Sequence, residues 1–257
     1  MSYKDIIVFL DGSRDNEARL DFALSIAKAH GARLTGVDVN APSAFDGEWA
    51  FRAQSLEESL RDKARRASVA TQFRIADREA TGWRNLYAYY SDLLIATQPN
   101  PDSYGKVLPA VPEDILVSAG VPMIVLPHQW EPRPIENAVI AWSPSSQATR
   151  AVHDAIPLLR QMKKITVFAF GRPDGRIEDI DLLCDHLRIH GVVAESDRWF
   201  DTGELTAMEA LFASRAMEDA DILVAGAYSH SRFRETLFGG VTRELLHQFS
   251  VPIFVSH

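Results

Sequence analysis

The chain has 257 residues, of which 46% are hydrophobic and 24% charged, and its formal net charge is -8 at pH 7. This composition is typical of a globular protein with a sizeable core. Because a negative field repels phosphate backbones, it argues against general nucleic-acid binding. The single cysteine, Cys184, excludes an intrachain disulfide and a metal site built from several cysteines. The chain shows neither a secretory signal nor an apolar run long enough for a bilayer, so we expect a cytoplasmic protein with no membrane partner.

The first half of the sequence alternates short apolar runs with helical patterns. Asp5–Leu10 is almost entirely apolar, which predicts a strand buried on both faces. Apolar residues at helical spacing follow, and Gly31 is placed to end that helix as its C-cap. Further strands are predicted at 33–39, 72–76, 92–97 and 121–126, and further helices around 56–64, at 86–90 and at 115–119.

The second half repeats this order about 130 residues later, as expected after duplication. The run DLLIA of the first half matches DILVA, and VPMIV matches VPIFV. Strands are predicted at 138–142, 165–170, 195–200, 221–225 and 251–255, and helices at 148–159, 180–190 and 206–218. We therefore expect two tandem α/β domains, residues 1–130 and 135–257, joined by a proline-rich linker near 131–134.

Alternating strands and helices predict a parallel sheet in each half, because right-handed crossovers place the helices on its faces. Ligands of such sheets bind beyond the carboxyl ends of the strands, where the strand order reverses. The loops that follow the first and fourth strands of each half are therefore the candidate sites.

Glycine, hydroxyl and basic residues gather after the fourth strand of the second half. Exposed amides at a glycine-rich helix start favour phosphate, while hydroxyl and basic side chains add donors. Alternatively, the glycines only permit a tight loop and close helix packing. The residues alone leave both interpretations open, and the candidate ligand-binding residues of this segment are Gly226, Ser229, His230, Gly239, Gly240, Val241 and Thr242.

These motifs, with LDGS near the start, resemble the universal stress protein family over essentially the whole chain, in particular a bacterial tandem branch. Its nucleotide-binding members carry Gly-x-x-Gly and then Gly-Ser or Gly-Thr at this place. Gly226 and Gly239 match, whereas Ser229 replaces the second glycine and Gly240 the hydroxyl residue. The resemblance implies two Rossmann-like domains of the adenine nucleotide alpha hydrolase-like type, each with a five-stranded parallel sheet.

In ATP-binding members an aspartate after the first strand contacts the adenosine. The resemblance gives this role to Asp11, whose alternative role is to cap the following helix. The first half then reads TQPNP after its fourth strand, and prolines and a β-branched residue suit a phosphate cradle poorly. In the second half Ser143, which has no carboxylate, stands in the place of the aspartate. We therefore expect a weakened site in the second half.

The sequence supports binding better than catalysis. It contains neither a Walker-type loop nor a Gly-x-Ser-x-Gly elbow. Our first hypothesis is a stress-response protein that binds ATP or another adenine nucleotide, with Mg²⁺, and is at most a slow incidental ATPase. The alternative is an interaction scaffold or apolar small-molecule binder with two vestigial sites. The family resemblance further implies that 121–126 and 251–255 pair the domains into an internal pseudo-dimer, and that two chains can form a homodimer.

His186 and His190 share one face of a predicted helix at the spacing of metal ligands. No acidic partner motif accompanies them, so we expect an ordinary exposed helix face and no metal site. Cys184 lies on the apolar stripe of the same helix, with Leu183 and Leu187, and is expected in the core.

Overall fold

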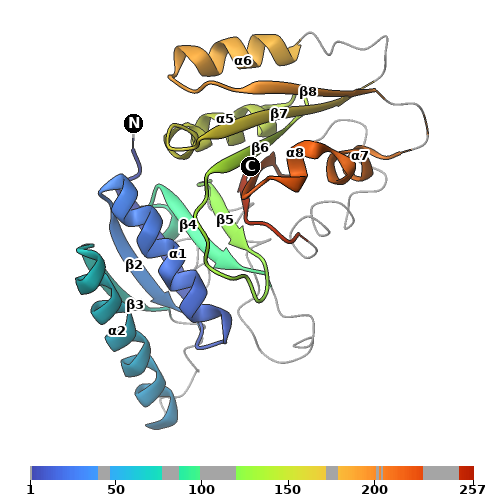
Figure 1. The fold of residues 1–257 in the computed structure, drawn as a ribbon. Helices are drawn as coiled ribbons and strands as arrows, with labels where there is room; N and C mark the ends of the chain where they lie inside the picture. Colours follow the sequence, from blue (N-terminus) through green and yellow to red (C-terminus); the bar gives the residue numbers. More distant parts are fainter. Residues whose placement is uncertain are drawn as a thin grey trace. The chain divides into compact units, whose positions relative to one another are not determined.

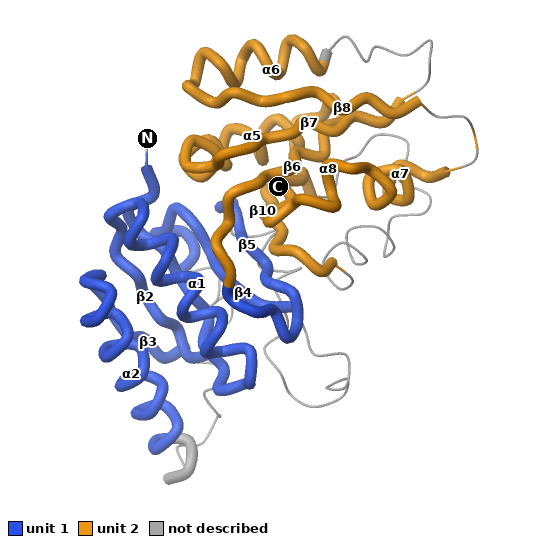
Figure 2. The backbone as a smooth tube through the Cα atoms, viewed as in Figure 1, with its two compact units in different colours: residues 1–132 blue, residues 133–257 orange. Residues whose placement is uncertain are grey.

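The structure, a computed structural model, describes residues 2–39, 47–76, 87–98, 120–171, 179–200, 203, 205–227 and 249–257. The chain divides into two compact units, Met1–Pro132 and Arg133–His257 (Figure 2). Each contains a parallel sheet flanked by helices, which confirms the predicted α/β class (Figure 1). In these residues no helix has both the length and the apolar character that a membrane span requires.

The first unit is a five-stranded sheet in the order β3-β2-β1-β4-β5. All of its strand pairs are parallel. Helix α1 packs on β1, β2 and β4, and α2 packs on β2, β3 and α1. The elements are β1 (Asp5–Leu10), α1 (Asp15–His30), β2 (Arg33–Asp38), α2 (Gly47–Ala67), β3 (Thr71–Ile75), β4 (Leu93–Thr97) and β5 (Met123–Leu126).

The second unit repeats this plan in the order β10-β9-β6-β7-β8, again with parallel pairs only. Helix α5 packs on β6, β9 and β10, and α6 packs on β7 and β8. The elements are β6 (Asn137–Trp142), α5 (Ser146–Leu159), β7 (Lys164–Gly171), α6 (Asp179–Ile189), β8 (Glu195–Phe200), α7 (Ala207–Ala213), α8 (Arg215–Glu218), β9 (Ile222–Gly226) and β10 (Ile253–Ser256).

The burial of each strand explains why the apolar runs predicted the sheets. Every residue of β4 and β5 is buried, and so is every residue of β1 after Asp5. Every residue of the outer strands β3 and β8 is at least partly exposed, and neither strand is a continuous apolar run in the sequence. Strands covered on both faces therefore appear as continuous apolar runs.

Two details of the helices test the sequence predictions. Gly31 ends α1 in the left-handed conformation (φ 60°), and its amide donates to Ala27 and Lys28, so the predicted C-cap is confirmed. The single helix predicted at 206–218 is wrong, because Ser214 is extended and divides it into α7 and α8. The Ser214 hydroxyl is fully buried and donates to the Leu211 carbonyl at 2.7 Å, so it satisfies a carbonyl at the end of α7. The helix predicted at 115–119 lies outside the described residues.

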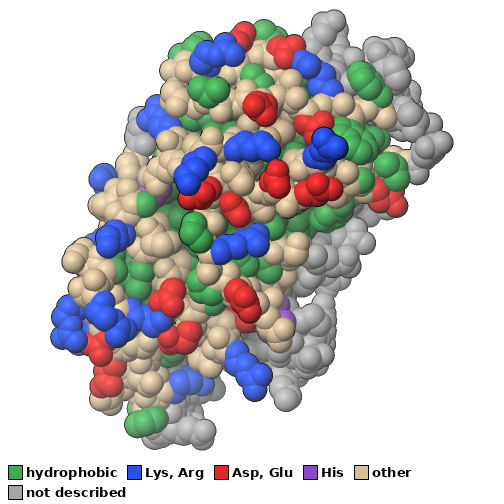
Figure 3. Space-filling model, in the orientation of Figure 1, with side chains coloured by type: hydrophobic (Ala, Val, Ile, Leu, Met, Phe, Trp, Pro, Cys, Tyr) green, Lys and Arg blue, Asp and Glu red, His purple; other side chains and the backbone are tan. Residues whose placement is uncertain are grey.

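The basic stretch of α2 is balanced by carboxylates. Arg61 pairs with Glu57, and Arg65 pairs with Asp62. Lys63 binds Glu17 and Asp21 of α1 at 2.8 and 2.6 Å. Basic and acidic side chains are intermixed over the face shown in Figure 3. This segment is therefore a solvated face whose basic side chains form ion pairs.

Candidate functional site

The strand order places one candidate site in each unit. It reverses between β1 and β4 in the first unit and between β6 and β9 in the second. A crevice for ligands lies beyond the carboxyl ends of the strands at such a reversal. Asp11 and Thr97 stand there in the first unit, and Ser143 and Gly226 stand there in the second. Both reversals have the same register, because Val8 lies opposite Ile95 in the first unit and the corresponding Ile140 lies opposite Val224 in the second.

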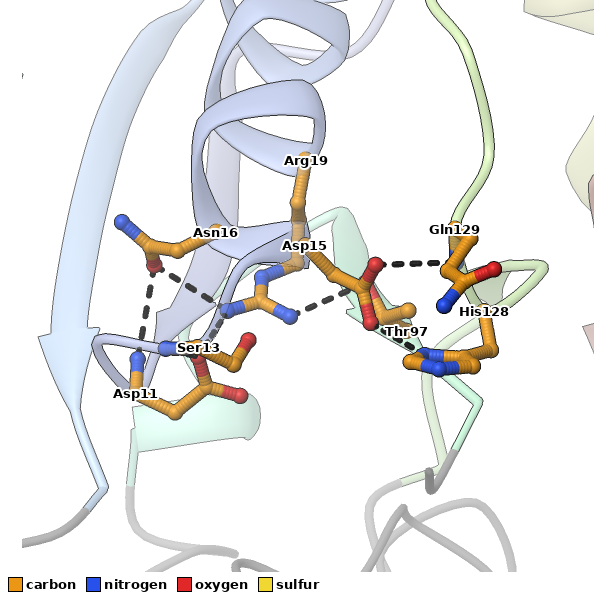
Figure 4. A network of polar contacts seen from close by, with 8 residues as sticks. All are labelled: Asp11, Ser13, Asp15, Asn16, Arg19, Thr97, His128 and Gln129. Atoms are coloured by element: carbon orange, nitrogen blue, oxygen red, sulfur yellow. Dashed lines mark hydrogen bonds and ion pairs between the residues drawn. The ribbon is translucent and has the colours of Figure 1, made fainter. Parts of the chain in front are cut away.

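In the first unit, the side chain of Arg19 bridges the two strands at this reversal (Figure 4). It projects from α1, and only 3% of it is exposed. Its Nη2 donates to Asp11 Oδ1 at 2.8 Å and to Asn16 Oδ1 at 3.0 Å, and its Nη1 donates to Thr97 Oγ1 at 2.9 Å. One guanidinium therefore joins the residue that follows β1 to the last residue of β4.

The carboxylate of Asp11 is held by this arginine and by the turn that follows the strand. Asp11 Oδ1 also accepts a hydrogen bond from the Ser13 amide at 2.9 Å. Burial acts to raise the pKa of Asp11, but the Arg19 guanidinium and the hydrogen bonds from Arg19 and Ser13 together hold it below its ordinary value of 3.8. The Asp11 side chain does not cap α1, because that helix begins after Arg14 without a side-chain cap.

A second pair of contacts closes the same edge of the first unit. Asp15, in the first turn of α1, lies 2.6 Å from His128 Nδ1 and accepts the Gln129 amide at 2.8 Å (Figure 4). The Gln98 side chain, just after β4, accepts the His128 amide at 3.3 Å. The segment that follows β5 is thus tied to the start of α1 and to the end of β4.

Sequence reasoning found Asp11 but missed Arg19 and His128. A signal for Arg19 does exist, because its neighbour Leu20 and also Ala23 belong to the buried stripe of α1. An arginine beside such a stripe needs a buried counter-charge, and Asp11 is the aspartate that follows the adjacent strand. No comparable pattern marks His128, whose contacts with Asp15 and Gln98 span distant segments of the chain.

The second unit has small or neutral residues at the corresponding positions. Ser143 follows β6 as Asp11 follows β1, and it is exposed. Ala151 takes the position of Arg19 in the helix, and Gly226 takes that of Thr97 at the strand end. The described residues at this reversal therefore contain no charged bridge like that of Arg19.

Gly226 is required by packing. A Cβ at this position would lie 2.5 Å from the Ala148 amide nitrogen and 2.6 Å from the Gln147 carbonyl carbon. The first turn of α5 therefore lies directly against the end of β9. Ser145 caps that turn, because its hydroxyl accepts the Ala148 amide at 3.2 Å.

The predicted site residues are thus placed only in part. Asp11 belongs to the first unit, and Ser143 and Gly226 belong to the second. Within the second unit, Ser143 follows β6 and Gly226 ends β9, and these two strands are neighbours. The other predicted ligand-binding residues, Ser229, His230, Gly239, Gly240, Val241 and Thr242, lie outside the described residues.

Two solved structures share the fold over almost the whole chain, and a third matches about half of it. A universal stress protein from Archaeoglobus fulgidus DSM 4304 is 14% identical, with a TM-score of 0.75 over 98% of this chain and 97% of that chain. The cytoplasmic domain of a prokaryotic cation chloride cotransporter is 13% identical, with a TM-score of 0.50 over 98% and 95%. Universal stress protein UspA from Lactobacillus plantarum is 20% identical, with a TM-score of 0.36 over 49% and 98%.

At the level of sequence, no curated protein matches the chain. Residues 2–85 match the model of the universal stress protein family. This segment contains β1 to β3 of the first unit and the residues Asp11 and Arg19. The first unit is therefore similar to the universal stress protein family over residues 2–85, and the chain as a whole shares the fold of a solved universal stress protein.

Proposed function

We propose that the chain is a cytoplasmic stress-response protein whose second unit binds an adenine nucleotide, such as ATP with Mg²⁺, with little or no catalysis. The observation that carries this proposal is the contrast between the two strand reversals. In the first unit a buried guanidinium bridges the reversal between Asp11 and Thr97. In the second unit Ala151 and Gly226 occupy the corresponding positions.

Helix α5 gives the second site its affinity for anions. Its first turn lies against the end of β9, so its amides and the positive end of its dipole are beside the strand reversal. The chain that leaves β9 carries the glycines and hydroxyls of the predicted phosphate loop, including Ser229, Gly239 and Thr242.

A second candidate function is an interaction scaffold that binds no nucleotide. It is favoured by Ser143, which offers no carboxylate to a ribose, and by the first unit, where the Asp11 carboxylate is bound to Arg19. In either case, pairing of the units through 121–126 and 251–255, and of two chains into a homodimer, stays part of the proposal that the family resemblance suggests.

Calorimetric titration of ligand-stripped protein with ATP and MgCl₂ separates the two candidates. We expect binding by the wild type and none by Gly239→Val, which removes a glycine from the phosphate loop. The control variant Ala70→Val introduces the same residue at an exposed position of the first unit and should bind ATP like the wild type. If neither heat nor a thermal shift appears at millimolar ATP, nucleotide binding is wrong and the scaffold stands.

Restoring a carboxylate after β6 gives a gain-of-function test of the same proposal. We expect Ser143→Asp to tighten ATP binding about tenfold, since a hydrogen bond to a charged group contributes about 1.5 kcal/mol. Ser143 is exposed, so the fold should accept the substitution. Ser146→Asp adds the same charge in the first turn of α5 and serves as the control. Equal effects of the two variants would show that charge alone, and not the position after β6, sets the affinity.

A further inference from the structure

Three histidines of the second unit gather on two adjacent helices, outside the candidate nucleotide site. His153 belongs to α5 and His186 to α6, whereas His190 directly follows the last residue of α6. His153 Nε2 and His186 Nε2 are 3.1 Å apart. The ring centroids are 5.2 Å apart for His153 and His186 and 4.7 Å apart for His186 and His190, the latter pair edge to face. Periodicity indicated the face shared by His186 and His190, but only the fold adds His153.

The contact between His153 and His186 requires a ring nitrogen that carries no proton. At 3.1 Å at least one of the two facing nitrogens must be an unprotonated acceptor. Among the described residues no carboxylate forms an ion pair with any of the three histidines. Neutral imidazole is the form that binds metal ions.

The spacing of the two facing nitrogens is that of two ligands on one metal ion. Metal–nitrogen bonds of about 2.0–2.1 Å at angles between about 90° and 110° place two ligand nitrogens about 2.9–3.4 Å apart. Imidazole nitrogens suit borderline ions such as Zn²⁺, Cu²⁺ and Ni²⁺. We propose that His153 and His186 form a two-histidine site for such a transition-metal ion, with His190 packed against the ring of His186.

Buried residues of α5 and α6 fix the two helices that carry His153 and His186. On α6, Leu183, Cys184 and Leu187 are buried, as the sequence predicted for this stripe. On α5, Val152 and Ala155 are buried beside His153. Fixed backbones lower the cost of bringing two ligands together. In the described part of the chain no group of three or more His, Cys, Asp or Glu side chains could hold a metal ion, so water would fill the remaining positions.

The test is metal titration of the full chain without a polyhistidine tag. Calorimetry with CuCl₂ and with ZnCl₂ should give one ion per chain and tighter binding of Cu²⁺, as the usual order of divalent metals predicts. His153→Gln and His186→Gln should each weaken Cu²⁺ binding by about tenfold or more, because each removes one of two protein ligands. Glutamine still forms hydrogen bonds, so these variants separate metal coordination from a simple contact between rings.

A control variant and a spectroscopic measurement test whether the histidine cluster itself binds the copper ion. His257→Gln alters a histidine outside the cluster and should bind Cu²⁺ like the wild type. Electron paramagnetic resonance of the copper-loaded wild type should show hyperfine coupling to imidazole nitrogen, and His153→Gln/His186→Gln should lose it. Wild-type affinity in both single variants, or an equal loss in His257→Gln, would overturn the proposal. Circular dichroism of each variant confirms that the fold is intact.

Discussion

Arg19 places a charged group where α1 meets the sheet. A buried guanidinium destabilises a fold unless a counter-charge and hydrogen-bond acceptors surround it. Asp11 supplies the charge, and Asn16 and Thr97 supply further oxygens. Because the Asp11 side chain is only 16% exposed, water screens this pair weakly. The network therefore stabilises the first unit while it occupies the edge where a ligand would bind.

The ion pair of Asp11 and Arg19 makes the stability of the first unit depend on pH. The folded pKa of Asp11 lies below 3.8, so its contribution is present above that pH and is lost as the pH falls through the folded value. We expect Asp11→Asn to lower the free energy of unfolding by about 3 kcal/mol near pH 7, because Arg19 loses its counter-charge. The difference from the wild type should shrink towards pH 2, as urea unfolding at both pH values would reveal.

Asp185→Asn is the control for this prediction. Asp185 also pairs with an arginine, Arg188, but both side chains are more than 60% exposed. Exposed pairs contribute about 0–1 kcal/mol. A loss for Asp185→Asn as large as that for Asp11→Asn would show that burial of the Asp11–Arg19 pair is unimportant.

The sequence predicted the position of Asp11 but not its partners. The end of an apolar strand run followed by LDGS is a local pattern. The contact between Arg19 and Thr97 joins residues 78 positions apart, and nothing local to either residue indicates it. The pair His153 and His186 has the same character, since the two residues are 33 positions apart on different helices.

The N-terminus of α5 is capped by Ser145 and packs against the end of β9. Ser145 is extended and accepts the Ala148 amide, while that same amide lies against Gly226. The cap therefore fixes the part of the helix that packs closest to the strand end. The sequence predicted this helix from 148, but the cap placed its start at Ser146.

Removing this cap should destabilise the second unit. We expect Ser145→Ala to lower the free energy of unfolding by about 1 kcal/mol, the usual cost of a lost N-cap. Denaturant unfolding measures the change. Ser145→Asp retains an acceptor and should stay near the wild type. A loss in Ser145→Asp equal to that in Ser145→Ala would mean that the hydroxyl does not act as a cap.

Strands that depend on a local sequence pattern were predicted well. The break between α7 and α8 was not predicted, because it depends on tertiary packing. The interior strands followed from apolar runs because both of their faces are buried. The break between α7 and α8 did not follow, because 206–218 keeps a helical pattern through Ser214. Burial of the Ser214 hydroxyl and its bond to Leu211 come from packing in the folded unit.

At the scale of the whole molecule, the two units share one strand order but have different residues at the strand reversal. The first fills its strand reversal with Arg19, and the second has Ala151 at that place in the helix. The repeated order was visible in the sequence, since the matching runs DLLIA and DILVA fall on β4 and β9. The sequence also predicted a poor phosphate cradle in the first half, but the Arg19 bridge was not visible, because it depends on which side chains meet across the sheet.

This asymmetry predicts one bound nucleotide per chain. If the proposed function holds, native mass spectrometry with ATP and MgCl₂ should show a single adduct for each chain, because only the second reversal lacks the arginine bridge. Gly239→Val should show none. Two adducts on the wild type would mean that the first unit also binds and that Arg19 does not close it.

The close packing at Gly226 also changes how relatives of this chain should be compared. Even a methyl group there would collide with the backbone of α5, whether or not the unit ever meets a ligand. A glycine at this column of an alignment would therefore persist in lineages that have abandoned nucleotides altogether. The column of Ser143, an exposed residue that this packing does not constrain in the same way, is the one that would distinguish ligand-binding lineages from the others.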